Sequence, residues 1–168
     1  DRKLRLIESL VESPSYQIAY ATYGREPLLA VIPSSTQTLT LYTHLGESLI
    51  SKVITKQATN MSFNNDGRFL GYWTASSMGT YDLEKSRRTT FRKSYENITQ
   101  VRWFDNYHLL VSHSGEASVV EFDGGNPTVL ASIQSGASAL LSPEQKELIY
   151  IQSPDSTTGP RLYRAKLR

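Results

Sequence analysis

The sequence predicts an all-β chain built from β-propeller blades, and three observations support this prediction. Short apolar runs of strand length recur along the 168 residues, and they are bounded by Gly, Pro, Asn, Asp and Ser. The same order of turn and strand returns about every 40 residues. Each copy of the repeat holds up to four strands, and four strands in a repeat of about 40–45 residues are typical of a propeller blade.

The repeat is clearest where a polar turn leads into an apolar strand. That strand starts at Leu28, Leu70, Leu109 and Leu148, which lie 42, 39 and 39 residues apart. In "FNNDGRFLGYW", residues 63–73, Asn-Asp-Gly supplies the backbone angles of a tight hairpin. A third strand follows in every copy and a fourth in the first three, so the array has about four blades.

We expect one domain of residues 1–168, with blades at about 15–55, 57–95, 97–134 and 136–168. The fourth blade lacks an outer strand, whereas the alternating segment at residues 2–11 has no blade of its own. We therefore expect residues 2–11 to be a closing strand, paired with strands distant in sequence or in another chain.

Two ways of closing the ring remain open. The chain is part of a larger propeller, whose open ends expose apolar blade faces and pair with another half, or it is a small closed ring of four blades. In the small ring, residues 2–11 would pair with residues 161–168.

Composition excludes several classes of protein. The chain has no cysteine, which excludes disulfides, thiolate metal sites and a cysteine nucleophile. No apolar run approaches the roughly 18–20 residues of a membrane span, so we expect no integral membrane segment. The net charge of +2 gives no argument for nucleic acid as a partner.

The turn "DGGNP" at residues 123–127 and the strands beside it resemble the end of the repeat in TolB-like, or PD40 (WD40-like), propellers. The turn at Asn64 and Asn65 is similar to the Ser-Pro-Asp-Gly turn of that family, and Ser142-Pro143 keeps its first half. The Trp-Asp dipeptide of WD40 blades is absent.

The resemblance implies a non-catalytic scaffold that binds a protein partner, in the bacterial periplasm or at the cell surface, or alternatively in the cytoplasm. TolB-like blades also resemble the gating propellers of some serine peptidases, so a non-catalytic part of such an enzyme is the alternative. A cytoplasmic WD40-type adaptor is a third reading.

We expect no enzymatic activity, no cofactor and no metal site. The run "SHSGE" at residues 112–116 joins Ser, His and Glu in one turn, but a catalytic Ser-His pair needs an orienting group and an oxyanion site, and neither can be named. The three histidines show no ligand spacing.

A basic segment, residues 85–93, holds five Lys and Arg and no acid. Such a segment either attracts phosphate or protects an outer edge strand from pairing with other sheets. Its place in the blade favours the edge strand, and we expect no nucleic acid.

Partner-binding residues are expected on the loops at one face of the propeller. The candidates are His113, Glu116, Asp155 and Arg161, of which Asp155 lies in the longest polar loop, residues 153–160.

Overall fold

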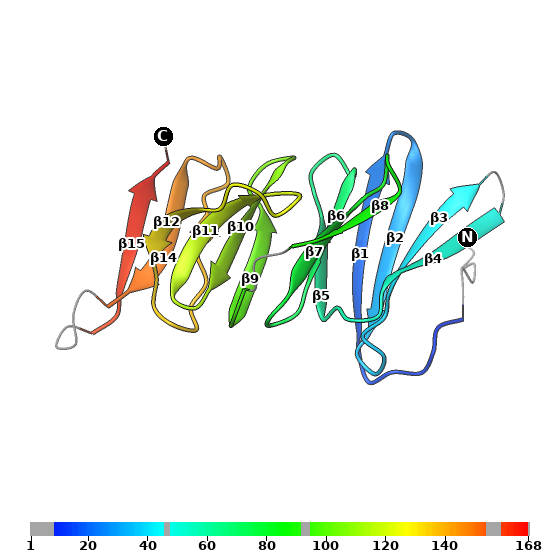
Figure 1. Ribbon diagram of the computed structural model, residues 1–168, viewed down its shortest axis with the longest axis horizontal. Helices are drawn as coiled ribbons and strands as arrows, with labels where there is room; N and C mark the ends of the chain where they lie inside the picture. The colour runs from blue at the N-terminus through cyan, green and yellow to red at the C-terminus, as the bar shows by residue number, and fades with distance from the viewer. Residues whose placement is uncertain (1–8, 46–47, 92–94, 154–158, 168) are drawn as a thin grey trace, which may run out of the picture.

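The computed structural model is an all-β chain whose sheets stand side by side in a row (Figure 1). It describes residues 9–45, 48–91, 95–153 and 159–167. Within these residues there are four antiparallel sheets and no helix. The predicted fold class, an all-β chain of antiparallel sheets consistent with a partial propeller, is confirmed.

Each sheet follows the chain in order. The first contains β1 (Tyr16–Tyr23), β2 (Glu26–Pro33), β3 (Leu39–Leu45) and β4 (Ser48–Thr55). The second contains β5 (Asn60–Phe63), β6 (Phe69–Trp73), β7 (Met78–Asp82) and β8 (Arg87–Thr90). The third contains β9 (Ile98–Trp103), β10 (His108–His113), β11 (Glu116–Glu121) and β12 (Thr128–Ser132). The fourth contains β13 (Leu140–Leu141), β14 (Glu147–Gln152) and β15 (Arg161–Lys166).

The first strand of each sheet is the inner strand of its blade. Successive blades approach one another through these strands, because β1 lies against β5 and β5 against β9. The last strands, β4, β8 and β12, therefore form the outer rim. The predicted basic edge strand is β8, at the open edge of its sheet.

Strand pairing corrects one position in the predicted repeat. Tyr20 pairs with Leu29 and Leu29 with Tyr42, just as Phe63, Leu70 and Tyr81 pair in the second blade. Leu29, and not Leu28, is thus the counterpart of Leu70. Because side chains alternate across a strand, this shift of one residue turns Leu28 to the opposite face.

The hairpin turn between the first two strands is held by a side chain in the second and fourth blades. Asn64 Oδ1 accepts a hydrogen bond from the Phe69 N–H at 3.0 Å. Ser142 Oγ does the same for the N–H groups of Lys146 and Glu147, each at 3.2 Å. An asparagine therefore serves where the TolB-like motif has serine, because both residues present a short polar acceptor.

An apolar cluster fills each junction between neighbouring blades. Leu28, Ala30 and Ile32 of the first blade pack with Leu70 and Tyr72 of the second. The other junctions are built alike, around Phe69, Met78, Trp103 and Leu109, and around Leu110, Ala117, Ala139 and Leu148. Fully burying one such side chain contributes roughly 1.5–3 kcal/mol, so the junctions hold the blades together.

The row of blades is open. The first and last sheets lie at opposite ends of the molecule (Figure 1), and β15 pairs with β14 alone among the described strands. The small closed ring of four blades is therefore wrong. Of the expected closing strand at residues 2–11, residues 2–8 lie outside the described part, and residues 9–11 form no strand.

Two turn glycines test the contact between the first two blades. Gly24 and Gly67 both have positive φ, at 64° and 76°. A Cβ on Gly67 would overlap the Thr22 carbonyl of the first blade, whereas a Cβ on Gly24 would meet open space. We expect Gly24→Ala to cost about 1–2 kcal/mol of unfolding free energy through its backbone alone. Gly67→Ala should cost about 1–3 kcal/mol more, because the blades must move apart.

Urea unfolding of the two variants measures this difference. Equal losses would show that the Gly67 turn does not carry the junction.

Candidate interaction faces

Each blade has two broad faces. We call the face turned toward the preceding blade in the chain the N-side face, and the face turned toward the following blade the C-side face. Every junction in the described chain joins a C-side face to an N-side face. The N-side face of the first blade and the C-side face of the fourth have no blade against them in the described chain.

The C-side face of the fourth blade is exposed and carries apolar residues beside a charged pair, since Arg164 Nε lies 3.6 Å from Glu147 Oε1 on the same face. Leu162 lies at the register position held by Met78 in the second blade and Ala117 in the third. Those two residues are 3% and 0% exposed because the next blade covers them, whereas Leu162 is 74% exposed. Leu140 and Ile151 are also exposed on this face. Its apolar residues have the chemistry of a blade junction, and no blade of the described chain covers them.

The N-side face of the first blade is exposed along its inner strand. Tyr20 holds the position of Trp103, which is 8% exposed against the second blade, yet Tyr20 is 67% exposed. Ile18, on the same face two residues earlier, is 64% exposed. Together they form an uncovered apolar strip on the inner strand.

The outer half of the same face is covered by the chain itself. Residues 9–11 lie across Val31, Pro33, Thr40 and Tyr42 and leave a cavity of about 260 Å³ between them. The Tyr16 hydroxyl donates a hydrogen bond to the Val11 carbonyl at 2.6 Å, which fixes the segment. Only the inner strip is thus open to a large partner.

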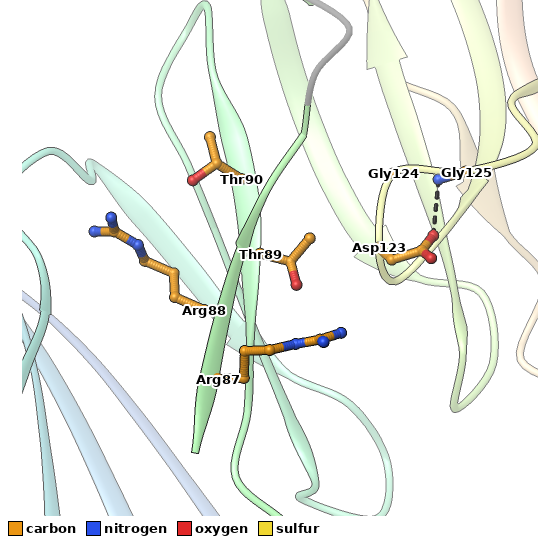
Figure 2. Close-up of a pocket in the computed structure, with 7 residues that line it drawn as sticks. All are labelled: Arg87, Arg88, Thr89, Thr90, Asp123, Gly124 and Gly125. Atoms are coloured by element: carbon orange, nitrogen blue, oxygen red, sulfur yellow. Dashed lines mark hydrogen bonds between the residues drawn. The ribbon is translucent and has the colours of Figure 1, made fainter. Parts of the chain in front are cut away.

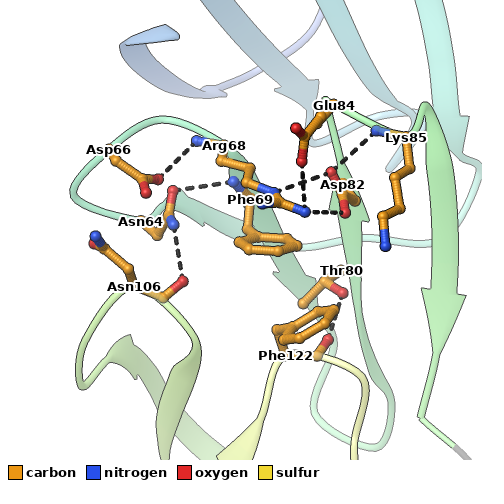
Figure 3. A network of polar contacts seen from close by, with 10 residues as sticks. All are labelled: Asn64, Asp66, Arg68, Phe69, Thr80, Asp82, Glu84, Lys85, Asn106 and Phe122. Atoms are coloured by element: carbon orange, nitrogen blue, oxygen red, sulfur yellow. Dashed lines mark hydrogen bonds and ion pairs between the residues drawn. The ribbon is translucent and has the colours of Figure 1, made fainter. Parts of the chain in front are cut away.

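Polar contacts set the geometry of the junction between the second and third blades (Figure 3). Asn64 Nδ2 donates to the Asn106 carbonyl at 3.0 Å, and Thr80 Oγ1 donates to the Phe122 carbonyl at 2.6 Å. Because hydrogen bonds are directional, they fix the angle between the blades more closely than apolar packing can.

The carboxylate of Asp82 holds the outer part of the second blade. It accepts from Arg68 Nη2 at 3.1 Å and from the Lys85 N–H at 3.2 Å (Figure 3). Burial alone would raise the pKa of Asp82. The hydrogen bonds from Arg68 and from the Lys85 N–H outweigh burial, so the pKa lies below its usual range.

An open groove of about 590 Å³ lies on the outer rim between β8 and the turn at residues 123–125 (Figure 2). Arg87 extends into it from one side, and Asp123, whose Oδ1 accepts from the Gly125 N–H at 2.9 Å, stands on the other. Gly124 packs on Phe91, where a Cβ would come within 2.8 Å of the ring. The groove offers both signs of charge, which suits a phosphate polymer poorly.

The predicted partner-binding residues do not gather into one site. His113 is buried, with its ring edge-on to Tyr95 at 4.9 Å between centroids, and Glu116 is half-buried. Arg161 is exposed at the start of β15, and Asp155 lies outside the described residues. Their role in binding stays a prediction.

The residues that stand out in the structure, Tyr20 and Leu162, were missed in the sequence. An uncovered junction residue is of the same apolar type as a covered one, so no local signal distinguishes them.

The Ser-His-Glu turn has a structural role. Ser112 is buried, and its Oγ accepts a hydrogen bond from the Ala139 N–H of the linker to the fourth blade at 2.9 Å. The described residues contain no cluster of His, Asp and Glu able to hold a metal. Nor does any helix among them have the length and apolarity to cross a bilayer.

Comparison with known proteins bears on the fold alone. No protein family model matches the chain, and no curated protein does so. An acylaminoacyl peptidase from Pyrococcus horikoshii, in an orthorhombic crystal form, matches with a TM-score of 0.56 at 12% identity. The match covers 93% of this chain and 33% of that one, so this chain spans about a third of the peptidase.

A functionally unknown protein from Desulfotomaculum acetoxidans DSM 771 matches at a TM-score of 0.40 and 11% identity, over 73% of this chain and 58% of that one. This second likeness is too weak to add to the argument. The first supports an arrangement of blades that also occurs within a longer chain.

The Asp82 contact predicts a pH dependence. A carboxylate with a lowered pKa stabilises the fold above the unfolded-state value of about 3.9, and this contribution is lost as the pH falls through the folded-state value. Asp82→Asn should therefore cost about 1.5–3 kcal/mol at pH 7, the range for hydrogen bonds to charged groups, and clearly less at pH 2–3.

Urea unfolding at both pH values measures the effect. Glu84→Gln is the comparison, because Glu84 pairs with the same Arg68 Nη2 at 2.7 Å but is 52% exposed, and we expect it to cost less than about 1 kcal/mol. An Asp82→Asn deficit of the same size at both pH values would contradict the charged contact.

The Ser112 contact predicts that its removal lowers the stability of the fold. Ser112→Ala leaves the buried Ala139 N–H without its acceptor and should cost about 1–3 kcal/mol. Ser114→Ala, at the exposed neighbouring hydroxyl, should cost less than about 1 kcal/mol. The measurements are urea unfolding and a screen of ester and peptide substrates, in which we expect no turnover by the parent chain. Turnover that disappears in Ser112→Ala would show a catalytic serine.

Proposed function

We propose that the chain is a non-catalytic, protein-binding module: an incomplete β-propeller whose two open faces take up further blades. The observation that carries the proposal is Leu162, which is 74% exposed at a position where Met78 and Ala117 are covered by the next blade. Exposed apolar residues gathered on one face, as Leu140, Ile151 and Leu162 are, mark an interaction site.

The chemistry of the fourth blade favours a polypeptide partner. Beside the apolar face, β15 presents an open strand edge, paired with β14 alone among the described strands. Its unpaired N–H and C=O groups are satisfied best by another strand, and an added strand is a common mode of protein recognition. A small ligand would cover neither the edge nor the face.

A second candidate function is that of a non-catalytic propeller segment of a peptidase. The likeness in fold to the acylaminoacyl peptidase favours it, with 93% of this chain covered. In that case the partner blades and the hydrolase residues belong to the remainder of such an enzyme. Both candidates assign the chain the same task, which is to dock through its end faces.

A further part of the proposal concerns location. The TolB-like turn at residues 123–127 supports the bacterial periplasm or cell surface, and the absence of cysteine fits that location and the alternative, the cytoplasm, equally.

The proposal predicts a stoichiometric complex. When the tagged chain is isolated from its host cells, we expect light scattering to give a mass above that of one chain. Leu162→Glu should abolish the complex, because it places a charge in the junction. Val129→Glu, at an exposed apolar residue of β12 away from the two end faces, should leave it intact.

Mass spectrometry of the complex then identifies what supplies the additional blades. A chain that stays monomeric in the cell, or a complex that survives Leu162→Glu, would refute the docking role.

A further inference from the structure

The outer strand β8 of the second blade differs from the outer strands β4 and β12 in its regularity. In β4, Ile54 is an extra residue opposite residues 39–40 of β3, and in β12 Leu130 is an extra residue opposite residues 117–118 of β11. Such bulges bend an edge strand and hinder its pairing with another chain. The pairs between β7 and β8 show no shift, so β8 presents a regular edge.

The free hydrogen-bonding groups of this edge follow from the strand pairing. The Phe91 N–H, just after β8, donates to the Met78 carbonyl of β7 at 3.1 Å. Main-chain groups alternate between the two sides of an antiparallel strand, so those of Thr89 also face β7. Those of Arg88 and Thr90 face outward, and no described residue bonds them. Two donors and two acceptors are therefore open to an added strand.

The two arginines of β8 have no carboxylate partner in the described chain. Both are exposed, and neither takes part in an ion pair among the described residues. Arg88 Nη1 donates to the Ile54 carbonyl at 3.3 Å, which leaves its charge uncompensated. Asp82, the residue across from Arg87, is bonded to Arg68 instead. An edge with two uncompensated positive charges discourages basic and apolar strands and attracts an acidic one.

The groove on the outer rim gives an added strand room on the side of the third blade. It has a volume of about 590 Å³ and lies between β8 and the turn at residues 123–125 (Figure 2). Arg87 and Thr89 point toward that turn, whereas Arg88 and Thr90 point the other way. Alternate side chains of an added strand therefore enter the groove.

Asp123 determines where an acidic side chain can lie in the groove. The turn that carries it approaches the end of β8, since Gly124 packs on Phe91. Arg87 lies at the start of the strand, so the position for an acid is beside Arg87. The position beside Thr89 favours a hydrogen-bond donor that can face Asp123. A phosphate polymer, charged at every residue, meets these two requirements poorly, whereas a peptide can meet both.

We propose that β8 binds an extended acidic segment of a partner protein, which adds to the second blade as a fifth strand antiparallel to β8. The main chain of the segment bonds the outward groups of Arg88 and Thr90. Two consecutive acidic residues lie opposite Arg88 and Arg87, one on each face of the sheet. With a hydroxyl opposite Thr89 and a β-branched residue opposite Thr90, the segment reads Val-Thr-Glu-Glu. This site is separate from the end faces of the docking role.

Fluorescence anisotropy with a labelled peptide, Val-Thr-Glu-Glu flanked by serines, is the first test, on the parent chain. We expect saturable binding, and none by Val-Thr-Lys-Lys, which places like charges together. An N-methyl group on the first glutamate removes the main-chain donor opposite Arg88 and keeps the charge. It should weaken binding about tenfold or more. Equal binding of the methylated peptide would show attraction by charge alone and would overturn the proposal, as would a parent chain that does not bind.

A charge exchange tests the register. Arg87→Glu should weaken the binding of Val-Thr-Glu-Glu about tenfold, because an attractive cross-strand pair becomes a repulsive one. Val-Thr-Glu-Lys should restore binding to this variant, whereas Val-Thr-Lys-Glu, with its lysine opposite Arg88, should not. Arg25→Glu, in the exposed turn between β1 and β2, makes the same change in net charge and should leave binding unchanged. Equal losses in the two variants would overturn the proposal.

Hydrogen exchange measured by NMR locates the added strand. The amide protons of Arg88 and Thr90 should exchange more slowly when Val-Thr-Glu-Glu is bound. The amide proton of Thr89 is already bonded to β7 and should not change. Protection that appears on other strands and not on β8 would contradict the proposed site.

Two further results separate this inference from its alternatives. A single-stranded oligonucleotide that displaces the peptide, and that Arg87→Glu releases, would assign β8 to a phosphate polymer and overturn the proposal. Leu162→Glu should leave peptide binding unchanged, because β15 and β8 lie far apart in the row (Figure 1). Loss of peptide binding in Leu162→Glu would place the site on the end face instead. Failure of the docking role therefore leaves this inference standing, and the reverse also holds.

Discussion

The packing of one blade face on the next is the interaction on which the whole structure depends. A four-stranded antiparallel sheet with apolar side chains on both faces cannot stay folded in water by itself, because each face needs a cover. The chain solves this by repetition, so that Leu70, Leu109 and Leu148 each pack on the blade before their own. The same requirement makes the two end faces unusual, since repetition within the described chain leaves them uncovered.

Much of this fold could be predicted from the sequence, because a blade is specified locally. Hairpin turns such as that at Gly67 and strand-length apolar runs mark each strand, and their period gives the blade. Register could not be predicted in the same way. In "PLLAVI" both Leu28 and Leu29 are apolar, and only the partners across the strands, Ala21 and Tyr20, decide which leucine faces which neighbour.

The exposed end faces could not be predicted from local sequence patterns, for a different reason. Tyr20 and Trp103 are both aromatic residues at the same register position, and their exposure differs because of what lies next to them in space. His113 was predicted to be exposed and is buried. A polar residue at the end of a strand suggests a surface loop, but the linker residue Tyr95 covers it. Such features depend on the arrangement of the blades, which a period alone does not give.

The hydrogen bonds across the middle junction have a consequence for the shape of any assembly. Asn64 bonds Asn106 at one edge of the junction, and the Trp103 indole donates to the Ser62 carbonyl at 3.0 Å near the inner strands. Two hydrogen bonds at separate points fix the angle between the second and third blades. A small change in that angle displaces the ends of the row by an amount that grows with their distance from the junction. The hydrogen bonds of Asn64 and Trp103 in the middle of the molecule thus fix how its two ends are oriented relative to each other.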